Sequence, residues 1–142
     1  MQVKDIMTKE VATLNSKDSV ERAAQLMKQY NVGAIPVCSE EKVIGIITDR
    51  DIALRSVAQG ENGRNQTVRD IMSSNPVVIN SATDIHDAAR IMSERQIRRL
   101  PVIENNNIVG IVSLGDIAVE NNLKDDAESA LSNISEPSTP VM

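Results

Sequence analysis

The stretch Gly45–Asp51, GIITDRD, is an apolar run that ends in a polar cluster, and the chain carries a closely similar stretch again at Gly110–Asp116, GIVSLGD. When the chain is compared with itself at this offset of 65 residues, residues 3–53 match residues 68–118 without a gap, with 16 identities in 51 positions. Self-similarity over such a length indicates a duplicated structural unit. The chain is therefore predicted to contain two copies of one fold.

Each copy begins with a short β-type run, residues 11–14 or 77–79, followed by an Asn-Ser loop and a helix. In the first copy Asp18 and Glu21 fit a capping box at the helix start, and in the second copy the helix is expected to begin near Thr83 or Asp84. Apolar residues recur along both helices at the spacing of one helical face. The core-facing positions predicted in this way are Val20, Ala23, Ala24 and Met27, and Ile85, Ala88, Ala89 and Met92.

Two apolar runs follow each helix, at residues 34–38 and 43–48 and at 98–103 and 108–113, and each pair is expected to form a hairpin. A second helix is predicted to start at Asp49 or Gly115, and the first of these to end near Gly60. Each unit is therefore β-α-β-β-α, a mixed α/β (α+β) fold.

The chain divides on this basis into a first repeat at 1–60, a linker at 61–67, a second repeat at 68–122 and an acidic tail at 123–142. The tail is expected to form a weak helix over residues 122–134 that docks on the module or on a partner, and a merely soluble end is the alternative. The apolar positions that would make this contact are Leu123, Ala127, Leu131 and Ile134.

Composition limits the classes of partner. The chain has 142 residues and a net charge of −5, and 41% of its residues are hydrophobic although Tyr30 is its only aromatic residue. The core must be aliphatic, and grooves for single-stranded nucleic acid, which use aromatic stacking, are not expected. The longest uncharged run, residues 71–83, contains Pro76 and is too short for a membrane span of about 20 residues. With a single cysteine and no signal-like start, the chain is expected to be cytoplasmic.

The order of elements and the strings VGAIPV (32–37), TDRDIALR (48–55) and IRRLPV (97–102) resemble the cystathionine-β-synthase (CBS) domain, here as a tandem pair or Bateman module. The resemblance covers residues 3–118 and is closest to small bacterial proteins that consist of little more than a CBS pair. It implies that the two repeats pack with pseudo-two-fold symmetry and leave two clefts, each able to hold an adenosyl ligand. It also implies a homodimer.

The repeated stretch ends each time in a hydroxyl–carboxylate pair, Thr48 with Asp51 in the first copy and Ser113 with Asp116 in the second. In one interpretation both pairs are helix N-terminal capping boxes. In the other the carboxylate, which only accepts hydrogen bonds, binds the two vicinal hydroxyls of a ribose. The two roles are compatible. Together with the family resemblance, the second interpretation predicts one ligand site at each pair.

The rest of each predicted site follows from the same resemblance. Without aromatic rings, adenine is expected in an aliphatic slot, with Thr13, Ile35, Pro36, Val78, Leu100 and Pro101 as candidates. Phosphates require cations, and the second copy has Arg98 and Arg99 where the first has Gly33 and Ala34. Arg50 is a further phosphate candidate, opposite Gly115 in the alignment of the two copies.

No nucleophile-base pair, metal triad, phosphate-binding loop or dinucleotide fingerprint is evident in the sequence, so the protein is predicted to be a non-catalytic ligand sensor without a cofactor. Two alternatives stay open: a ligand-free structural or dimerisation module, and a redox or metal sensor using Cys38 and His86. The residues do not distinguish AMP, ADP, ATP, S-adenosylmethionine, NAD and a cyclic dinucleotide, because all contain adenosine.

Overall fold

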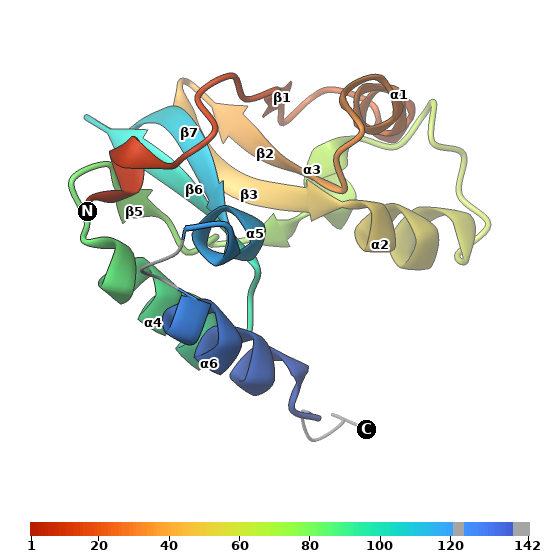
Figure 1. The fold of residues 1–142 in the computed structure, drawn as a ribbon. Helices are drawn as coiled ribbons and strands as arrows, with labels where there is room; N and C mark the ends of the chain where they lie inside the picture. The colour runs from red at the N-terminus through yellow and green to blue at the C-terminus, as the bar shows by residue number, and fades with distance from the viewer. Residues whose placement is uncertain (121–123, 138–142) are drawn as a thin grey trace. The chain divides into compact units, whose positions relative to one another are not determined.

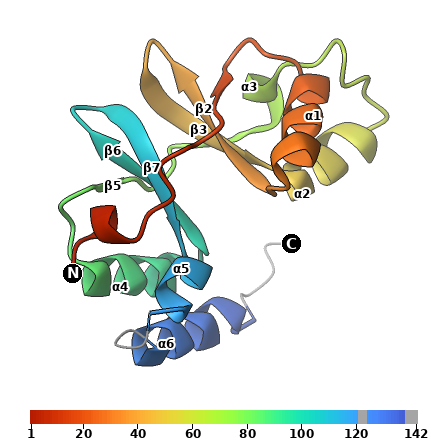
Figure 2. The same ribbon diagram turned by 45° about the horizontal axis from the view of Figure 1, so that its top comes forward.

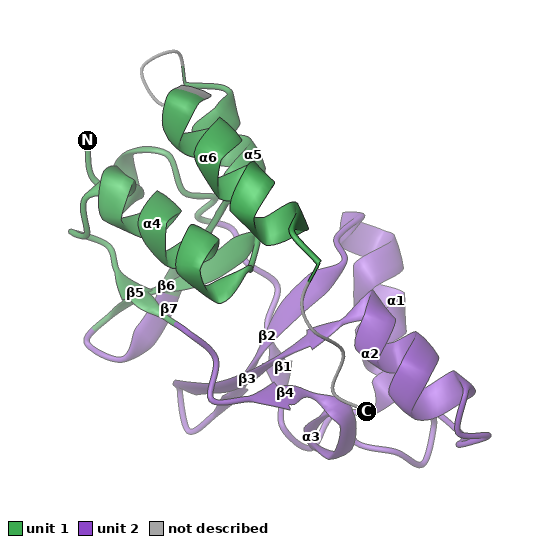
Figure 3. Cartoon of the chain, turned by 90° about the horizontal axis from the view of Figure 1, so that it is seen from below, with its two compact units in different colours: residues 1–9, 78–104, 109–142 green, residues 10–77, 105–108 purple. Residues whose placement is uncertain are grey.

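The computed structural model describes residues 1–120 and 124–137, which fall into two compact units. Unit 1 consists of residues 1–9, 78–104 and 109–142, and unit 2 of residues 10–77 and 105–108 (Figure 3). Each unit contains one of the two predicted β-α-β-β-α copies.

Unit 2 contains a four-stranded sheet in the order β1-β2-β3-β4 (Figure 1). β1 runs parallel to β2, whereas the β2–β3 and β3–β4 pairs are antiparallel. In chain order its elements are β1 (Leu14–Asn15), α1 (Val20–Tyr30), β2 (Ala34–Ser39), β3 (Lys42–Thr48), α2 (Asp49–Ile52), the π-helical turn η2 (Ala53–Val57), α3 (Val68–Ile71) and β4 (Ser73–Ser74).

Unit 1 contains a three-stranded sheet in the order β5-β6-β7, with β5 parallel to β6. Its elements are the short 3-10 helix η1 (Val3–Asp5), β5 (Ile79–Asn80), α4 (Ile85–Arg95), β6 (Arg99–Glu104), β7 (Asn107–Ser113), α5 (Leu114–Ala118) and α6 (Lys124–Ser135). α6 lies alongside α4 (Figure 2). The predicted order of elements and the mixed α/β class are confirmed in both units.

The starts of the first helices differ in part from the prediction. Ser19, not Asp18, is the N-cap of α1, and its hydroxyl accepts a hydrogen bond from Arg22 N at 3.0 Å. The Asp18 carboxylate instead accepts from Asn15 N at 2.8 Å and closes the preceding turn, so the predicted box with Glu21 is wrong. In the second copy Asp84 is the N-cap of α4, as expected.

The first strands are also shorter than predicted. β1 begins at Leu14 and β5 at Ile79, so Thr13 and Val78 lie immediately before their strands. Pairing with β2 extends over only two residues, Leu14 and Asn15. The apolar character of the preceding residues therefore does not by itself make them strand.

The core of unit 2 is an aliphatic cluster that includes two methionines. It consists of Leu14, Val20, Ala23, Leu26, Met27, Ile35, Val37, Ile47, Val68, Ile71 and Met72. The predicted face of α1 is correct except at Ala24, which is exposed, while all four predicted positions of α4 are buried. The matched Ala89 is buried in unit 1, where α6 packs against α4.

The VKDIM segment (3–7) and the VRDIM segment (68–72) do not stay with the copies that follow them in the sequence. The VKDIM segment belongs to unit 1, where Val3 N donates to Thr83 O at 2.9 Å and Thr8 exchanges two backbone hydrogen bonds with Ile111. The VRDIM segment belongs to unit 2, where Val68 N donates to Asp18 O at 2.8 Å. Each compact unit therefore contains the first segment of the other sequence repeat.

Gly45 and Gly110, which open the two repeated stretches, allow these segments to approach the sheets. A Cβ at Gly45 would lie 2.9 Å from Ser73 O and would overlap Met72 Sδ. A Cβ at Gly110 would lie 2.6 Å from Met7 Sδ and 2.8 Å from Thr8 O. Because the obstacles include backbone, neither contact can be relieved by moving one flexible side chain. Glycine is required here for space.

We expect Gly45→Ala and Gly110→Ala each to lower the free energy of unfolding by about 2 kcal/mol, the range for overpacking a close-packed site. Urea unfolding followed by circular dichroism measures this. Gly63→Ala is the matched control, since its Cβ would have ordinary contacts of 3.5 Å or more and should change stability by less than about 0.5 kcal/mol. Equal losses in all three variants would contradict the close-approach explanation.

Candidate functional site

The first hydroxyl–carboxylate pair lies at the junction of β3 and α2. Thr48 Oγ1 accepts from Asp51 N at 3.0 Å, and Asp51 Oδ2 accepts from Thr48 N at 3.0 Å. This reciprocal capping box uses only one oxygen of the carboxylate. Asp51 is only 8% exposed as a residue, and its other carboxylate oxygen, Oδ1, lies outside the box.

The second hydroxyl–carboxylate pair has the same geometry at the junction of β7 and α5. Ser113 Oγ accepts from Asp116 N at 3.1 Å, and Asp116 Oδ2 accepts from Ser113 N at 2.8 Å. Asp116 is half-buried. The capping interpretation is therefore correct for both pairs, and each carboxylate retains an oxygen outside the box.

Aspartate at the third helical position is not itself a sign of a ligand site. Thr67 N donates to Asp70 Oδ2 at 3.1 Å in a box of the same kind at α3, where Asp70 is exposed. Asp5 caps η1 in a similar way. Asp51 differs from both in being buried. A carboxylate that only caps a helix can stay in solvent, so the burial of Asp51 needs a further explanation.

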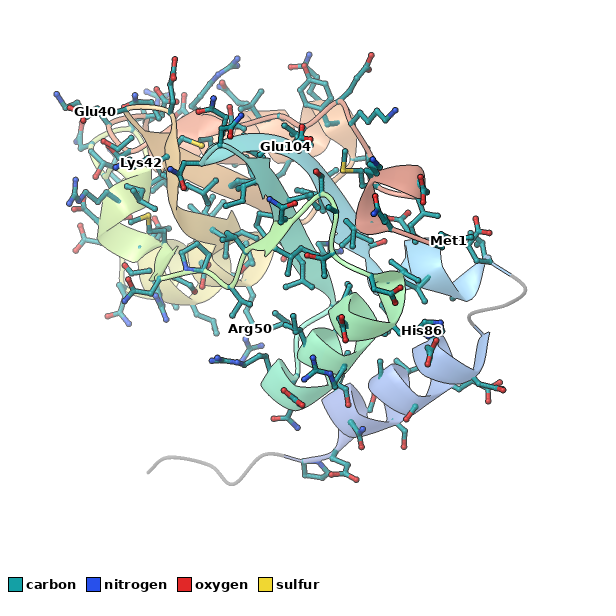
Figure 4. All side chains as sticks on the ribbon, turned by 90° about the vertical axis from the view of Figure 1, so that its left-hand side faces the viewer. Met1, Glu40, Lys42, Arg50, His86 and Glu104 are labelled. Atoms are coloured by element: carbon teal, nitrogen blue, oxygen red, sulfur yellow. The ribbon has the colours of Figure 1, made fainter. Side chains whose placement is uncertain are left out.

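The residues before β2 and β6 lie beside these helix starts. Asp49 N donates to Gly33 O at 2.9 Å in unit 2, and Leu114 N donates to Arg98 O at 2.8 Å in unit 1. The structure therefore brings the backbone of Arg98 next to the second hydroxyl–carboxylate pair. Arg98 and Arg99 both have exposed side chains. Arg50, exposed at the start of α2, projects from its helix (Figure 4).

The predicted adenine positions are of two kinds. Ile35 and Leu100 have no exposed area, and Pro36 and Pro101 are also buried. Ile35 is part of the unit 2 core, so its side chain is already in contact with protein. Thr13 is exposed and Val78 half-buried, each just before the first strand of its unit. Thr13 and Val78 are thus solvent-accessible, whereas the predicted positions in β2 and β6 have buried side chains.

Arg55 is a residue of this region that the sequence interpretation missed. Its Nε lies 4.0 Å from Asp51 Oδ1, and its Nη1 donates to the carbonyl oxygens of Ile71 at 3.1 Å and Met72 at 3.4 Å. The position four residues after Asp51 on a predicted helix is a signal for such a pair. Nothing local in the sequence points to the two carbonyls.

The residues of the redox and metal alternative lie apart from these pairs in the chain and have ordinary surroundings. Burial raises the pKa of the half-buried Cys38 thiol, which disfavours the reactive thiolate. His86 lies at the start of α4 (Figure 4) and pairs through Nδ1 with Asp126 of α6. Within the described part of the chain, no three His, Cys, Asp or Glu side chains are placed to hold a metal ion together.

The tail helix α6 packs within unit 1, which agrees with the predicted docking on the module itself. Gln96 Nε2 donates to Asn133 O at 3.0 Å, and Ala130 is 2% exposed although the sequence did not single it out. Ala127 is buried as predicted, Leu131 is 46% exposed, and the predicted contact Leu123 lies outside the described residues. α5 and α6 together line a cavity of about 370 Å³. Its lining residues are Leu114, Gly115 and Ala118 of α5 and Ala127, Glu128 and Leu131 of α6.

Comparison with known proteins identifies the fold. The model of the CBS domain matches the chain twice, over residues 3–57 and 68–120. The chain belongs to the CBS domain family. It is a CBS pair, a class of module that is generally regulatory and non-catalytic.

Individual relatives agree with this assignment. The CBS domain-containing protein YhcV of Bacillus subtilis is 50% identical over 133 residues, which cover 94% of each chain. Hypoxic Response Protein I, crystallised with two coordinated zinc ions, has a TM-score of 0.78 and 30% identity, over 84% of this chain and 98% of its own. The CBS pair of protein MJ0100, in complex with 5′-methylthioadenosine and S-adenosyl-L-methionine, has a TM-score of 0.74 and 32% identity, over 83% and 93%.

Across the described ranges, every helix is too short or too polar to cross a lipid bilayer.

The environment of Cys38 makes a testable prediction. Because its pKa is raised by burial, alkylation by iodoacetamide should need a more alkaline pH in the native protein than in the urea-unfolded chain. The sign for stability follows: the unfolded thiol ionises first, so stability falls as the pH rises through the native pKa of Cys38. Rate–pH profiles of both states measure the shift. A native profile displaced to lower pH would instead favour the redox alternative.

Proposed function

We propose that this CBS pair is a sensor that binds an adenosyl compound at each hydroxyl–carboxylate pair and changes its contact with a protein partner in response. The observation that carries the proposal is the Asp51 carboxylate. It is largely buried, Oδ2 is engaged in the capping box, and the nearest cationic group to Oδ1 is Arg55 Nε, at 4.0 Å, beyond hydrogen-bond distance. Burying a charged carboxylate is costly unless its acceptors are used, and the vicinal hydroxyls of a ribose supply two donors.

In unit 2, the proposed first site combines Thr48 and Asp51 with Arg50 and with the edge of β2 near Pro36. The Thr48 hydroxyl and Asp51 carboxylate hold the ribose, and the exposed Arg50 guanidinium is available to a phosphate. Adenine lies against aliphatic surface and is recognised by backbone groups, with Thr13 at the open edge. Ile35 supports this surface from the core.

In unit 1, the proposed second site combines Ser113 and Asp116 with Arg98 and Arg99. The hydrogen bond from Leu114 N to Arg98 O supports this grouping, because it holds the arginine backbone at the start of α5. Leu100, Pro101 and Val78 form the corresponding aliphatic surface. The two sites are not equivalent, since Gly33 and Ala34 occupy the matching positions in the first copy.

The choice of adenosyl ligands is supported by MJ0100, whose CBS pair is in complex with 5′-methylthioadenosine and S-adenosyl-L-methionine. At 32% identity this similarity supports the ligand class, and AMP, ADP, ATP, NAD and cyclic dinucleotides stay candidates with it. The ligand acts as a regulatory effector and no catalytic role is proposed. We propose a cytoplasmic location.

A homodimer is part of the proposal. Leu54 and Val57 are large apolar residues exposed on the surface of unit 2, at 46% and 71%. Exposed aliphatic residues close together in the chain are a common feature of contact surfaces. A ligand that changes the packing of this module would alter such a contact by shifting the population of its conformations.

A structural module without ligands is the second candidate. It is favoured by the capping boxes, which are complete in the protein alone. In that function the aspartates contribute only to helix stability, and the dimer is indifferent to nucleotides. A metal sensor is a further alternative. It is suggested by Hypoxic Response Protein I, whose crystal structure contains two coordinated zinc ions. For both alternatives the test below gives a different result.

Thermal unfolding with AMP, ATP, S-adenosylmethionine and NAD tests the sensor. A ligand present at about 100 times its dissociation constant adds about 2.7 kcal/mol to stability. Asp51→Asn and Asp116→Asn are the informative variants. An amide oxygen can still accept the capping hydrogen bond, but the amide nitrogen is a donor and cannot accept from a diol. We expect each variant to fold and to lose the ligand-induced stabilisation of its own site.

Asp70→Asn is the matched control, because Asp70 makes the same capping box at an exposed position. It should keep the full response to ligand. If no compound raises the melting temperature of the wild type, the structural module is the better explanation. If all three variants respond alike, the aspartates have no ligand-binding role. Stabilisation by Zn²⁺ alone would favour the metal sensor.

A further inference from the structure

Arg55 connects the first hydroxyl–carboxylate pair to a segment that is distant in the sequence. Its Nε is 4.0 Å from Asp51 Oδ1, the oxygen that the capping box does not use. Its Nη1 donates to the carbonyl oxygens of Ile71 and Met72 at the end of α3. The last carbonyls of a helix lack partners within it, and an arginine is a suitable donor for them.

Arg55 lies in a π-helical segment of the backbone. Residues Ala53–Val57 form the π-helical turn η2, which directly follows α2. Turns of this kind are rare and occur frequently at functional sites. The side chain is 54% exposed, and its guanidinium is held by polar contacts to Asp51 and to the two carbonyl oxygens.

Among the residues that the structure describes, the second copy lacks the corresponding connection. Glu120 occupies the position that matches Arg55 at the offset of 65 residues, and the matches of Ile71 and Met72 are Ile6 and Met7. A glutamate carboxylate has no proton to donate to those carbonyl oxygens and cannot attract the Asp116 carboxylate. The two sites therefore differ in chemistry as well as in sequence.

We propose that Arg55 is a positioning residue of the first ligand site, which orients Asp51 for a ribose and transmits occupancy of that site to the VRDIM segment. A ribose hydroxyl that donates to Oδ1 competes for the oxygen nearest to Arg55 and changes its hold on the two carbonyls. This segment begins the second sequence repeat and continues through β4 to residue 78, where unit 1 resumes. The second site has no such link. The inference rests on the proposed function of Asp51.

The test uses the full chain carrying Asp116→Asn, so that only the first site binds. Isothermal titration with AMP, ATP and S-adenosylmethionine in turn is compared for this parent, Arg55→Gln, Arg55→Lys and the matched control Glu120→Gln. We expect Arg55→Gln to weaken binding about tenfold, as for one charge-assisted contact. Lysine keeps the charge but not the planar fork and should lose about threefold. Glu120→Gln should change affinity less than about twofold.

Hydrogen exchange is the second readout, because a merely structural Arg55 would not make it depend on ligand. Ligand should alter amide exchange in residues 68–74 of the parent, and this response should be absent in Arg55→Gln. If none of the three compounds binds the parent, the proposed function and this inference both fail. If the parent binds and Arg55→Gln behaves like Glu120→Gln in affinity and exchange, the inference alone is overturned. Should Arg55→Gln not fold, Arg55→Lys decides by the same criteria.

Discussion

The close approach of two methionine segments to two glycines is the constraint on which the structure depends. Met72 lies against Gly45 and Met7 against Gly110, at distances that leave no room for a Cβ. Through these contacts each unit includes the first segment of the other sequence repeat. The two repeats therefore cannot be separated at the linker without removing a part of each core. In unit 2 the exchanged residues Val68, Ile71 and Met72 are core residues.

The stretches GIITDRD (45–51) and GIVSLGD (110–116) each begin a helix and also form a candidate site. Helix capping and ligand binding would both use the oxygens of one aspartate. The capping box engages one carboxylate oxygen of Asp51 and leaves the other toward Arg55. A carboxylate has enough acceptor capacity for both functions, whereas a residue with a single acceptor does not. Four capping boxes with aspartate occur in the described chain, and burial separates Asp51 from the exposed Asp70.

The two copies of the fold differ in the charged residues on their surfaces. An aliphatic core allows two near copies of one fold to pack with similar side chains, and the charged residues at the surface then differ freely. Arg98 and Arg99 stand opposite Gly33 and Ala34, and Glu120 stands opposite Arg55. In unit 1 the helix α6 packs against α4, and Ala89 of α4 is buried. Its counterpart in α1 of unit 2, Ala24, is exposed. A duplicated scaffold thus carries two chemically distinct candidate sites.

The sequence by itself determined the features that depend on neighbours in the chain. The repeat, the order of strands and helices, the buried face of α4, and the caps at Thr48 and Ser113 all follow from spacing within a few residues. The tertiary structure decided what depends on distant partners. The VKDIM segment packs in unit 1 and the VRDIM segment in unit 2, each away from the rest of its own sequence repeat. β1 is limited to the two residues that pair with β2. Arg55 donates to the carbonyl oxygens of Ile71 and Met72. The physical reason is that periodicity records which face of an element is buried, whereas the choice of partner depends on the shapes that meet there, such as a glycine that admits a methionine sulfur.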